Sequence, residues 1–126
     1  MNTLAAVLAS IVLVPQPTRL VEGTGSCPTG ATVRAVADAT VPAEGYRLSV
    51  RPDGIVIASS DAAGRFYAEQ TLDQLRAGDA YPCVEIEDAP AFRWRGFMLD
   101  EGRHFFGKEV VRRLIDAMAM HKLNVL

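Results

Sequence analysis

The chain has 126 residues, which suffice for one domain with a hydrophobic core or for one small domain and part of a second. Thirteen Lys and Arg residues against fifteen Asp and Glu residues give a formal net charge of -2. Proteins that bind nucleic acid usually carry a basic patch, so this composition argues against nucleic acid as a partner. The apolar run that begins the chain is shorter than the roughly 20 residues of a membrane span, so we expect no span.

The amino terminus, residues 1–10, is apolar and rich in small residues, like the core and cleavage region of a signal peptide. It has no Lys or Arg before the apolar run, which a signal peptide normally has. A clipped signal segment and an ordinary leading strand therefore both remain open. The first alternative favours an exported protein, periplasmic or extracellular.

Cys27 and Cys83 have neither CxxC spacing nor a His close by in the sequence, which argues against a zinc site. A disulfide between them would suit an exported protein, but sequence alone cannot establish that they are close. We favour two unpaired thiols that pack as small hydrophobes. Asp38, Asp61 and Asp73 lack metal-ligand spacing, and no glycine-rich phosphate loop is present, so we expect no metal and no cofactor.

The first third of the chain predicts little regular structure. Residues 11–14 form a β-branched run that a proline ends, so we expect a strand there. Residues 18–42 are rich in Gly, Thr, Ala and Pro, a composition typical of irregular chain. Within them, only residues 32–36 are expected to form a strand.

The clearest local signal in the first half is a β-hairpin. Apolar and polar residues alternate over residues 46–51, and the alternation resumes at residues 55–57. Between them lie Pro52, Asp53 and Gly54, each of which favours a turn for its own reason. The pattern predicts a hairpin with one buried face.

A helix is predicted after the hairpin, over residues 62–77. Asp61 can cap its first turn, and Gly78 marks its end. Phe66 and Tyr67, near its start, are expected to pack the helix onto the hairpin.

Val84 and Ile86 alternate with Glu85 and Glu87, which predicts one more short strand. With the hairpin and the helix, this strand completes a small α+β domain over residues 11–88, in which one helix covers a sheet. An Asp-Ala-Pro linker follows it.

The last third predicts a second unit, which starts at residue 89. Residues 97–99 are continuously apolar, the pattern of a strand buried on both faces of a parallel sheet. A helix with one apolar stripe follows from its cap, Gly107, to His121, whose charge suits the negative helix end. Residues 123–126 predict another strand. Because a single βαβ unit leaves sheet edges and one face uncovered, we expect the chain to end inside a domain.

Polar side chains gather after the predicted strand. Asp100 and Glu101 resemble the carboxylate pair of a glycosidase, but successive side chains on a strand point to opposite faces. We therefore expect Asp100 to pair with Arg103 or a loop amide, and Glu101 to be exposed to solvent. The donor fork of Arg103 suits vicinal hydroxyls or a carboxylate, although an arginine after a strand is usually only an ion-pair member. His104 could be an acid or base, but it is more often a packing residue.

The stretch RGFMLDEGRHFF, residues 95–106, strongly resembles the opening of the catalytic barrel of family-20 glycoside hydrolases, the β-N-acetylhexosaminidases. The similarity continues through residues 115–119 and 122–124. Further segments are similar to the accessory α/β domain that precedes this barrel: residues 14–17, 45–48 and 64–72. The resemblance covers nearly all of residues 11–126.

This resemblance implies an exo-acting enzyme that hydrolyses terminal N-acetylglucosamine or N-acetylgalactosamine from glycans with retention. The substrate's own acetamido oxygen is the nucleophile in the family. The family's catalytic Asp-Glu pair lies further downstream, so it is not Asp100 and Glu101, and no catalytic residue is expected in this chain. Arg103 falls on the arginine of an Arg-His-Phe motif that holds ring hydroxyls of the sugar. Asp100 and His104 are expected to support it.

The predicted fold is therefore an α+β accessory domain followed by the first βα unit of an incomplete (β/α)₈ barrel, residues 89–126. Such a fragment should not turn over substrate, because most of the barrel that positions the sugar is missing. A glycan that ends in N-acetylglucosamine or N-acetylgalactosamine is the expected partner. The alternative function is a non-catalytic module that binds a glycan or a protein.

Overall fold

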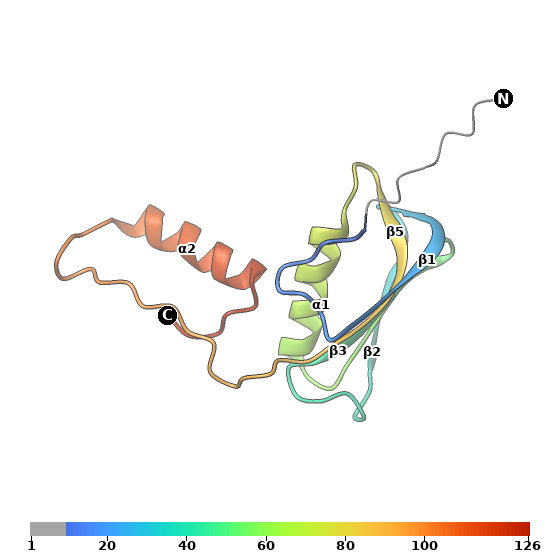
Figure 1. Cartoon of the computed structure of the whole chain (residues 1–126), viewed down its shortest axis with the longest axis horizontal. Coiled ribbons are helices and arrows are strands. Elements are labelled where there is room, and N and C mark those ends of the chain that lie inside the picture. Colours follow the sequence, from blue (N-terminus) through green and yellow to red (C-terminus); the bar gives the residue numbers. More distant parts are fainter. Residues whose placement is uncertain (1–9) are drawn as a thin grey trace.

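The computed structural model describes residues 10–126, which form two parts (Figure 1). The first part, here called the layer, comprises residues 19–88 and is a sheet with one helix against it. The second part, here called the arm, comprises residues 92–126, in which an extended segment runs away from the layer and a helix runs back toward it (Figure 1). The possible signal segment, residues 1–10, lies outside the described residues except for its last residue.

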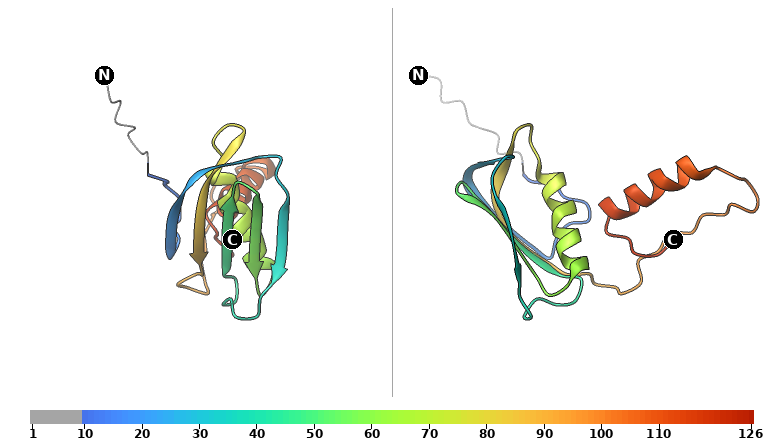
Figure 2. Two further views of the ribbon diagram at one scale, coloured as in Figure 1. Left: turned by 90° about the vertical axis from the view of Figure 1, so that its right-hand side faces the viewer. Right: turned by 180° about the vertical axis from the view of Figure 1, so that it is seen from behind.

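The sheet of the layer has five strands. In chain order they are β1 (Arg19–Pro28), β2 (Val33–Ala37), β3 (Tyr46–Arg51), β4 (Gly54–Ser59) and β5 (Ala80–Asp88). Their order across the sheet is β1-β5-β3-β4-β2. All neighbours pair antiparallel except β2 and β4, which are parallel. Helix α1 (Ala62–Leu75) lies along one face of this sheet (Figure 2).

The predicted hairpin is confirmed as β3 and β4. Arg51 pairs with Gly54 at its tip, and Leu48 pairs with Ile57 in its middle. Gly54 has a φ of +152°, a conformation that a residue with a Cβ rarely adopts, which explains why glycine occupies this turn position. Leu48 and Ile57 are each only 1% exposed, so one face of the hairpin is buried as the alternation predicted.

Helix α1 begins at its predicted cap. The Asp61 carboxylate accepts a hydrogen bond from the backbone N–H of Gly64, with an Oδ1–N distance of 2.7 Å. Gly64 lies so close to the sheet that a Cβ there would collide with the carbonyl oxygen of Gly45. Tyr67 is buried in the core, whereas Phe66 is 41% exposed, so only one of the two aromatic residues packs as expected.

The core of the layer lies between α1 and the sheet. Its largest fully buried side chains come mainly from the three central strands: Tyr46, Leu48, Val50, Ile55, Ile57, Val84 and Ile86. Both cysteines of the chain are buried and unpaired, as expected, and Cys27 is part of this core. Burial raises the pKa of the Cys27 thiol.

Two expectations for the first third are wrong. Residues 11–14 are not a strand. Instead Leu13 packs into the core, and the Val14 N–H donates to Gln74 Oε1 at 2.9 Å. Residues 18–42 are not irregular either, because they contain the ten-residue strand β1 before the expected strand β2. Strand β1 is held by pairing with β5, from Arg19 with Glu87 to Pro28 with Ala80, so no local sequence pattern predicts it.

The arm differs from the strand-helix-strand unit that was expected. Residues 97–99 are not assigned to a strand, and Met98 is 89% exposed rather than buried. A single parallel bridge joins Gly96 to Val125, with the Phe97 N–H donating to the Val125 carbonyl at 2.9 Å. A strand buried on both faces needs neighbours on both sides, and residues 10–126 supply only this bridge.

The helix of the arm, α2 (Lys108–Met120), is confirmed with Gly107 as its cap. Its apolar stripe is only partly covered, since Met118 is buried whereas Ile115 is 50% exposed. The carboxyl end of α2 reaches the layer, where the Gln74 side-chain amide donates to the Met120 carbonyl at 3.0 Å. The arm thus contacts the layer at one end and is otherwise exposed.

Candidate functional site

The predicted site residues lie on one loop of the arm, residues 100–107, which connects the extended segment to α2. Asp100 closes its first turn. One carboxylate oxygen accepts from the backbone N–H groups of Gly102 and Arg103, both at 3.0 Å. The other lies 3.1 Å from Nε of Arg103. The expectation that Asp100 pairs with Arg103 or with a loop amide is therefore confirmed, since it does both.

The Arg103 side chain points into solvent and is 92% exposed. Among residues 10–126, its ion pair is with Asp100, and this pair engages the guanidinium at Nε. The exposure leaves the Nη groups accessible to a ligand in solution. A guanidinium can form paired hydrogen bonds with two adjacent oxygens, so the loop presents a group suited to vicinal hydroxyls.

Glu101 does not have the simple solvent exposure that was expected. Its Oε2 accepts a hydrogen bond from the Phe106 N–H at 3.0 Å, across the width of the loop. Its Oε1 is buried and has no hydrogen-bond partner among the described residues. The carboxylate turns back toward the loop because a backbone N–H is available to it there.

His104 is exposed and packs against Phe106. The two rings meet edge to face, with centroids 4.8 Å apart and an interplanar angle of 71°. This contact agrees with the packing role expected for His104. His104 and Glu101 therefore both contact Phe106, His104 through its ring and Glu101 through the backbone N–H.

A second group of polar side chains joins the arm to the layer, and its centre is Arg95. Nε donates to the Lys122 carbonyl at 2.7 Å, and Nη1 donates to the Phe92 carbonyl at 2.7 Å. Both Nη groups also donate to the Glu44 carboxylate, at 3.1 and 3.3 Å, and Nη2 reaches the Tyr67 hydroxyl at 3.0 Å. The guanidinium therefore uses all five of its N–H donors.

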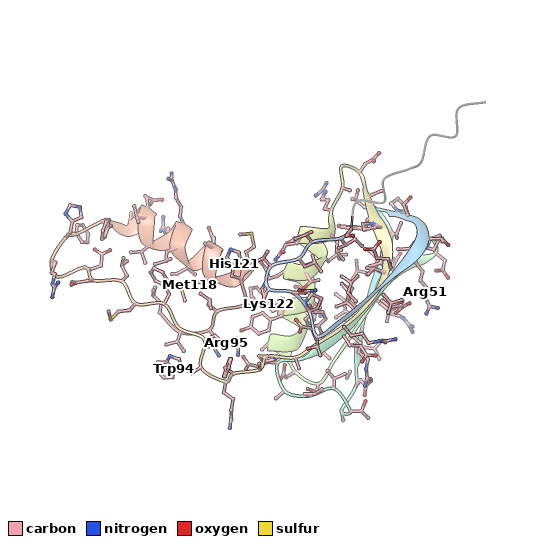
Figure 3. All side chains as sticks on the ribbon, viewed as in Figure 1. Arg51, Trp94, Arg95, Met118, His121 and Lys122 are labelled. Carbon is pink, nitrogen blue, oxygen red and sulfur yellow. The ribbon has the colours of Figure 1, made fainter. Side chains whose placement is uncertain are left out.

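Lys122 forms the other half of this junction and is only 7% exposed. Its Nζ donates to the Tyr46 hydroxyl at 2.8 Å and to Asp88 Oδ2 at 3.0 Å. The Tyr46 hydroxyl also lies 2.6 Å from Oγ1 of Thr71 on α1. Lys122 has a φ of 60°, a conformation that costs a non-glycine residue about 1 kcal/mol, and its buried contacts offset that cost. Figure 3 shows Arg95 and Lys122 between the arm and the layer.

The electrostatics of the junction follow from these contacts. Hydrogen bonding by Arg95 lowers the pKa of the Glu44 carboxyl, and Glu44 in turn raises the pKa of Arg95. Burial lowers the pKa of Lys122, an effect that hydrogen bonding to Asp88 opposes. A cavity of about 360 Å³ lies beside these groups. Because Arg95 pairs with Glu44 and Lys122 pairs with Asp88, the junction is suited to holding the arm against the layer.

Sequence reasoning missed the junction entirely. Glu44 and Arg95 are 51 residues apart, and Tyr46 and Lys122 are 76 apart. Neither pair has a local spacing that would connect its members. By contrast, Asp100 and Arg103 are three residues apart, so their pairing could be predicted.

Within residues 10–126, no group of three or more His, Cys, Asp or Glu side chains could hold a metal ion. The same part of the chain contains no helix long and apolar enough to cross a membrane.

Comparison with known families assigns both parts of the chain. The family model described as "Glycosyl hydrolase family 20, domain 2" matches residues 2–89, and "Glycosyl hydrolase family 20, catalytic domain" matches residues 92–126. The first match alone covers more than half of the chain. The chain therefore belongs to glycosyl hydrolase family 20, as the sequence resemblance predicted.

Individual relatives agree with this family. A β-hexosaminidase of Akkermansia muciniphila is 36% identical over 130 residues, covering 97% of this chain and 26% of that protein. A solved structure of a glycoside hydrolase family 20 β-N-acetylglucosaminidase has a TM-score of 0.83 at 36% identity, covering 91% of this chain and 28% of the solved one. An exo β-N-acetylglucosaminidase from Vibrio harveyi, solved with N-acetylglucosamine, has a TM-score of 0.83 at 27% identity. The match covers 89% of this chain and 24% of the solved one.

The chain thus spans about a quarter of the length of the A. muciniphila enzyme, and it spans 14% and 10% of two further curated relatives. Two of these three relatives are named β-hexosaminidase and the third is named N,N'-diacetylchitobiase. The chain resembles this class of glycoside hydrolases. The predicted small sheet with a helix is what the structure and its neighbours share.

Proposed function

We propose that this chain is part of an exo-acting β-N-acetylhexosaminidase that removes terminal N-acetylglucosamine or N-acetylgalactosamine from glycans with retention of configuration. The observation that carries the proposal is the match of residues 92–126 to the family-20 catalytic domain, which includes the loop of Arg103. The relative from V. harveyi solved with N-acetylglucosamine supports the substrate class.

In this proposal residues 11–88 form an accessory domain, and residues 89–126 form the first βα unit of a (β/α)₈ catalytic barrel. Two observations support the division. The two family matches meet between residues 89 and 92. The arm also exposes large apolar side chains, including Phe97, Met98 and Ile115, that a barrel core would cover.

Arg103 is the substrate-binding residue of this part of the enzyme. Its guanidinium donates hydrogen bonds to ring hydroxyls of the sugar, for which its exposed Nη groups are available. Asp100 supports it by holding Nε and by closing the turn that carries it. His104 supports the loop through its contact with Phe106.

The chemical step needs groups outside this chain. The substrate's acetamido oxygen attacks the anomeric carbon, an aspartate orients the acetamide, and a neighbouring glutamate protonates the leaving oxygen. Asp100 is not that aspartate, because the family's Asp-Glu pair lies further downstream; Asp100 instead pairs with Arg103 and accepts from two loop amides. The isolated 126-residue chain is accordingly inactive, because it holds the sugar at one side only.

The alternative of a non-catalytic accessory module is not favoured. A module of that kind would account for the match over residues 2–89. It would not explain why residues 92–126 match a catalytic domain.

The test is hydrolysis of a chromogenic N-acetylglucosaminide by the full-length product of the reading frame, with the isolated chain assayed beside it. We expect turnover by the former and none by the latter. Arg103→Ala in the full-length product should lower kcat/KM by about 2–5 kcal/mol of transition-state binding, the range for truncated charged contacts. An inactive full-length product would contradict the proposed function.

Arg112→Ala is the matched control for Arg103→Ala. Arg112 is also exposed, lies on the same part of the chain and pairs with an acid three residues away, Glu109. Its removal should leave kcat/KM within a factor of two. An equal loss in both variants would show that arginine charge in general, rather than Arg103, supports activity.

A further inference from the structure

The loop that carries Arg103 has two acidic side chains with different geometries. Asp100 makes local contacts, to the backbone two and three residues ahead of it and to Nε of Arg103. Glu101 makes a longer connection, from the start of the loop to the Phe106 N–H at its end. Asp100 therefore shapes the turn, whereas Glu101 ties together the two ends of the segment that contains Arg103.

The end of the loop has little other support. Gly107, the cap of α2, provides no side-chain hydrogen bond to the first turn of the helix. Because it lacks a Cβ, glycine adopts the φ of 83° seen here as readily as other conformations. Phe106 immediately precedes this cap. The Glu101 carboxylate is thus held beside the positive end of α2, where a negative charge is stabilising. Without it, the loop end would depend on the contact between His104 and Phe106.

The burial of Glu101 also needs a reason. Its Oε1 is enclosed without a partner among residues 10–126, and the residue lines a largely apolar hollow with Phe97 and Val111. An enclosed carboxylate oxygen without a donor is unfavourable, and an exposed rotamer would avoid it. The hydrogen bond from the Phe106 N–H offsets part of that cost, so it is the contact that favours the inward position of the carboxylate.

We propose that Glu101 is a positioning residue for Arg103: by binding the Phe106 N–H it holds the loop in the conformation that presents the Arg103 guanidinium to the sugar. The inference rests on the proposed function of Arg103 in binding the substrate. Glu101 itself touches no substrate atom. Its carboxylate acts through the backbone of residues 102–106.

The test compares Glu101→Ala with Glu101→Gln in the full-length product, with chromogenic N-acetylglucosaminide as substrate. Alanine removes the acceptor for the Phe106 N–H, whereas the glutamine side-chain oxygen retains it. We expect Glu101→Ala to raise KM about tenfold with kcat changed less than twofold, and Glu101→Gln to restore most of the loss. Glu109→Ala, an exposed acid on α2, is the control and should change neither constant.

A double-mutant cycle separates positioning from a general loss of structure. If Glu101 acts through Arg103, Glu101→Ala should have no further effect on KM once Arg103 is alanine. Equal effects in both backgrounds would overturn the inference, as would a Glu101→Gln variant as impaired as Glu101→Ala. Thermal melting of each variant checks that it is folded.

Hydrogen exchange of the Phe106 amide in the same full-length protein supplies a readout that does not need activity. Glu101→Ala should speed this exchange at least tenfold, and Glu101→Gln should not. Unchanged exchange at Phe106 would overturn the inference even in an active enzyme. An inactive wild-type protein in which the exchange responds as expected would instead place the failure in the proposed function.

Discussion

The layer and the arm have similar fractions of apolar residues but bury them very differently. In the layer, the central strands and α1 enclose Leu48, Ile57 and Ile86, each 1% exposed. In the arm, Met98 is 89% exposed and Ile115 is 50% exposed. The layer therefore contains both surfaces of its core. In the arm, among residues 10–126, comparable apolar side chains remain exposed to solvent.

The layer and the arm also differ in the kind of contact that stabilises them. Burial of apolar area holds the layer together and contributes roughly 25 cal/mol for each Å² removed from water. The arm is fastened to the layer largely by polar contacts, through Arg95 with Glu44 and Lys122 with Asp88. Substitutions in the layer and in the arm should therefore differ in how much they lower the free energy of unfolding. They should also differ in how far along the chain they speed hydrogen exchange.

The largest expected effect comes from the core of the layer. Ile57→Ala should lower the free energy of unfolding by about 3–4 kcal/mol, because it removes a fully buried side chain and leaves a cavity. Ile115→Ala on α2 should change it by less than about 1 kcal/mol, because half of that side chain already contacts water. Urea unfolding followed by circular dichroism measures both. Similar losses in the two variants would show that the arm has a core of its own.

The junction should give the next largest effect. Arg95→Ala removes five hydrogen bonds and leaves Glu44 without its partner, which should cost about 2–3 kcal/mol. The loss should be local. Native-state hydrogen exchange should speed up at the Asn124 amide, which donates to the Arg95 carbonyl, and not at amides of β3.

Arg112→Ala is a suitable control for this experiment. Arg112 is an exposed arginine of the same part of the chain with a single salt bridge. Such a pair contributes less than about 1 kcal/mol. Faster exchange in β3 after Arg95→Ala would contradict the view that the junction serves the arm alone.

How much of each element can be predicted from sequence depends on how close together in the chain its interacting residues lie. The hairpin of β3 and β4 could be predicted because its turn, Pro52-Asp53-Gly54, and its alternation lie within one short stretch. Strand β1 could not, because it is an exposed edge strand without alternation and carries a bulge between Glu22 and Ser26. Only its pairing with β5, which lies far along the chain, makes it a strand.

In the candidate site, too, the contact between close neighbours in the sequence could be predicted and the longer one could not. The pairing of Asp100 with Arg103 spans three residues and was predicted. The bond from Phe106 to Glu101 was not, because it depends on how the loop folds back. The strand expected at residues 97–99 has the right composition but lacks neighbours on both sides in this structure. The apolar pattern of residues 97–99 therefore predicted a burial that the contacts within residues 10–126 do not provide.

A smaller effect is expected at the cap of α1. Asp61→Ala should cost about 1–2 kcal/mol, because the Asp61 carboxylate accepts from the Gly64 N–H and from the Glu44 N–H, at 2.7 and 2.8 Å. Asp73→Ala, on the exposed side of the same helix, should be neutral or slightly stabilising because alanine is the better helix former. The difference in urea midpoint between the two variants measures the cap. Equal midpoints would show that α1 is held by packing alone.

The smallest expected effect is the dependence of the junction on pH. Arg95 lowers the pKa of Glu44 in the folded protein below its ordinary value of 4.5, so at acidic pH the unfolded chain binds more protons than the folded chain. The Glu44 contribution to stability is therefore fully present above about pH 4.5 and is lost as the pH falls through the lowered pKa. Exchange at Asn124 should accelerate over this range.

Glu44→Gln isolates that contribution, because glutamine keeps a hydrogen-bond acceptor near Arg95 but does not titrate. In this variant the Asn124 amide should exchange faster at neutral pH and should respond less to acid. Asp61 also has a lowered pKa, caused by the Glu44 and Gly64 N–H groups, so some acid sensitivity of α1 should remain in both proteins. If Glu44→Gln changed acid sensitivity in β3 as much as at Asn124, the arm and the layer would unfold as one unit and the contrast between them would fail.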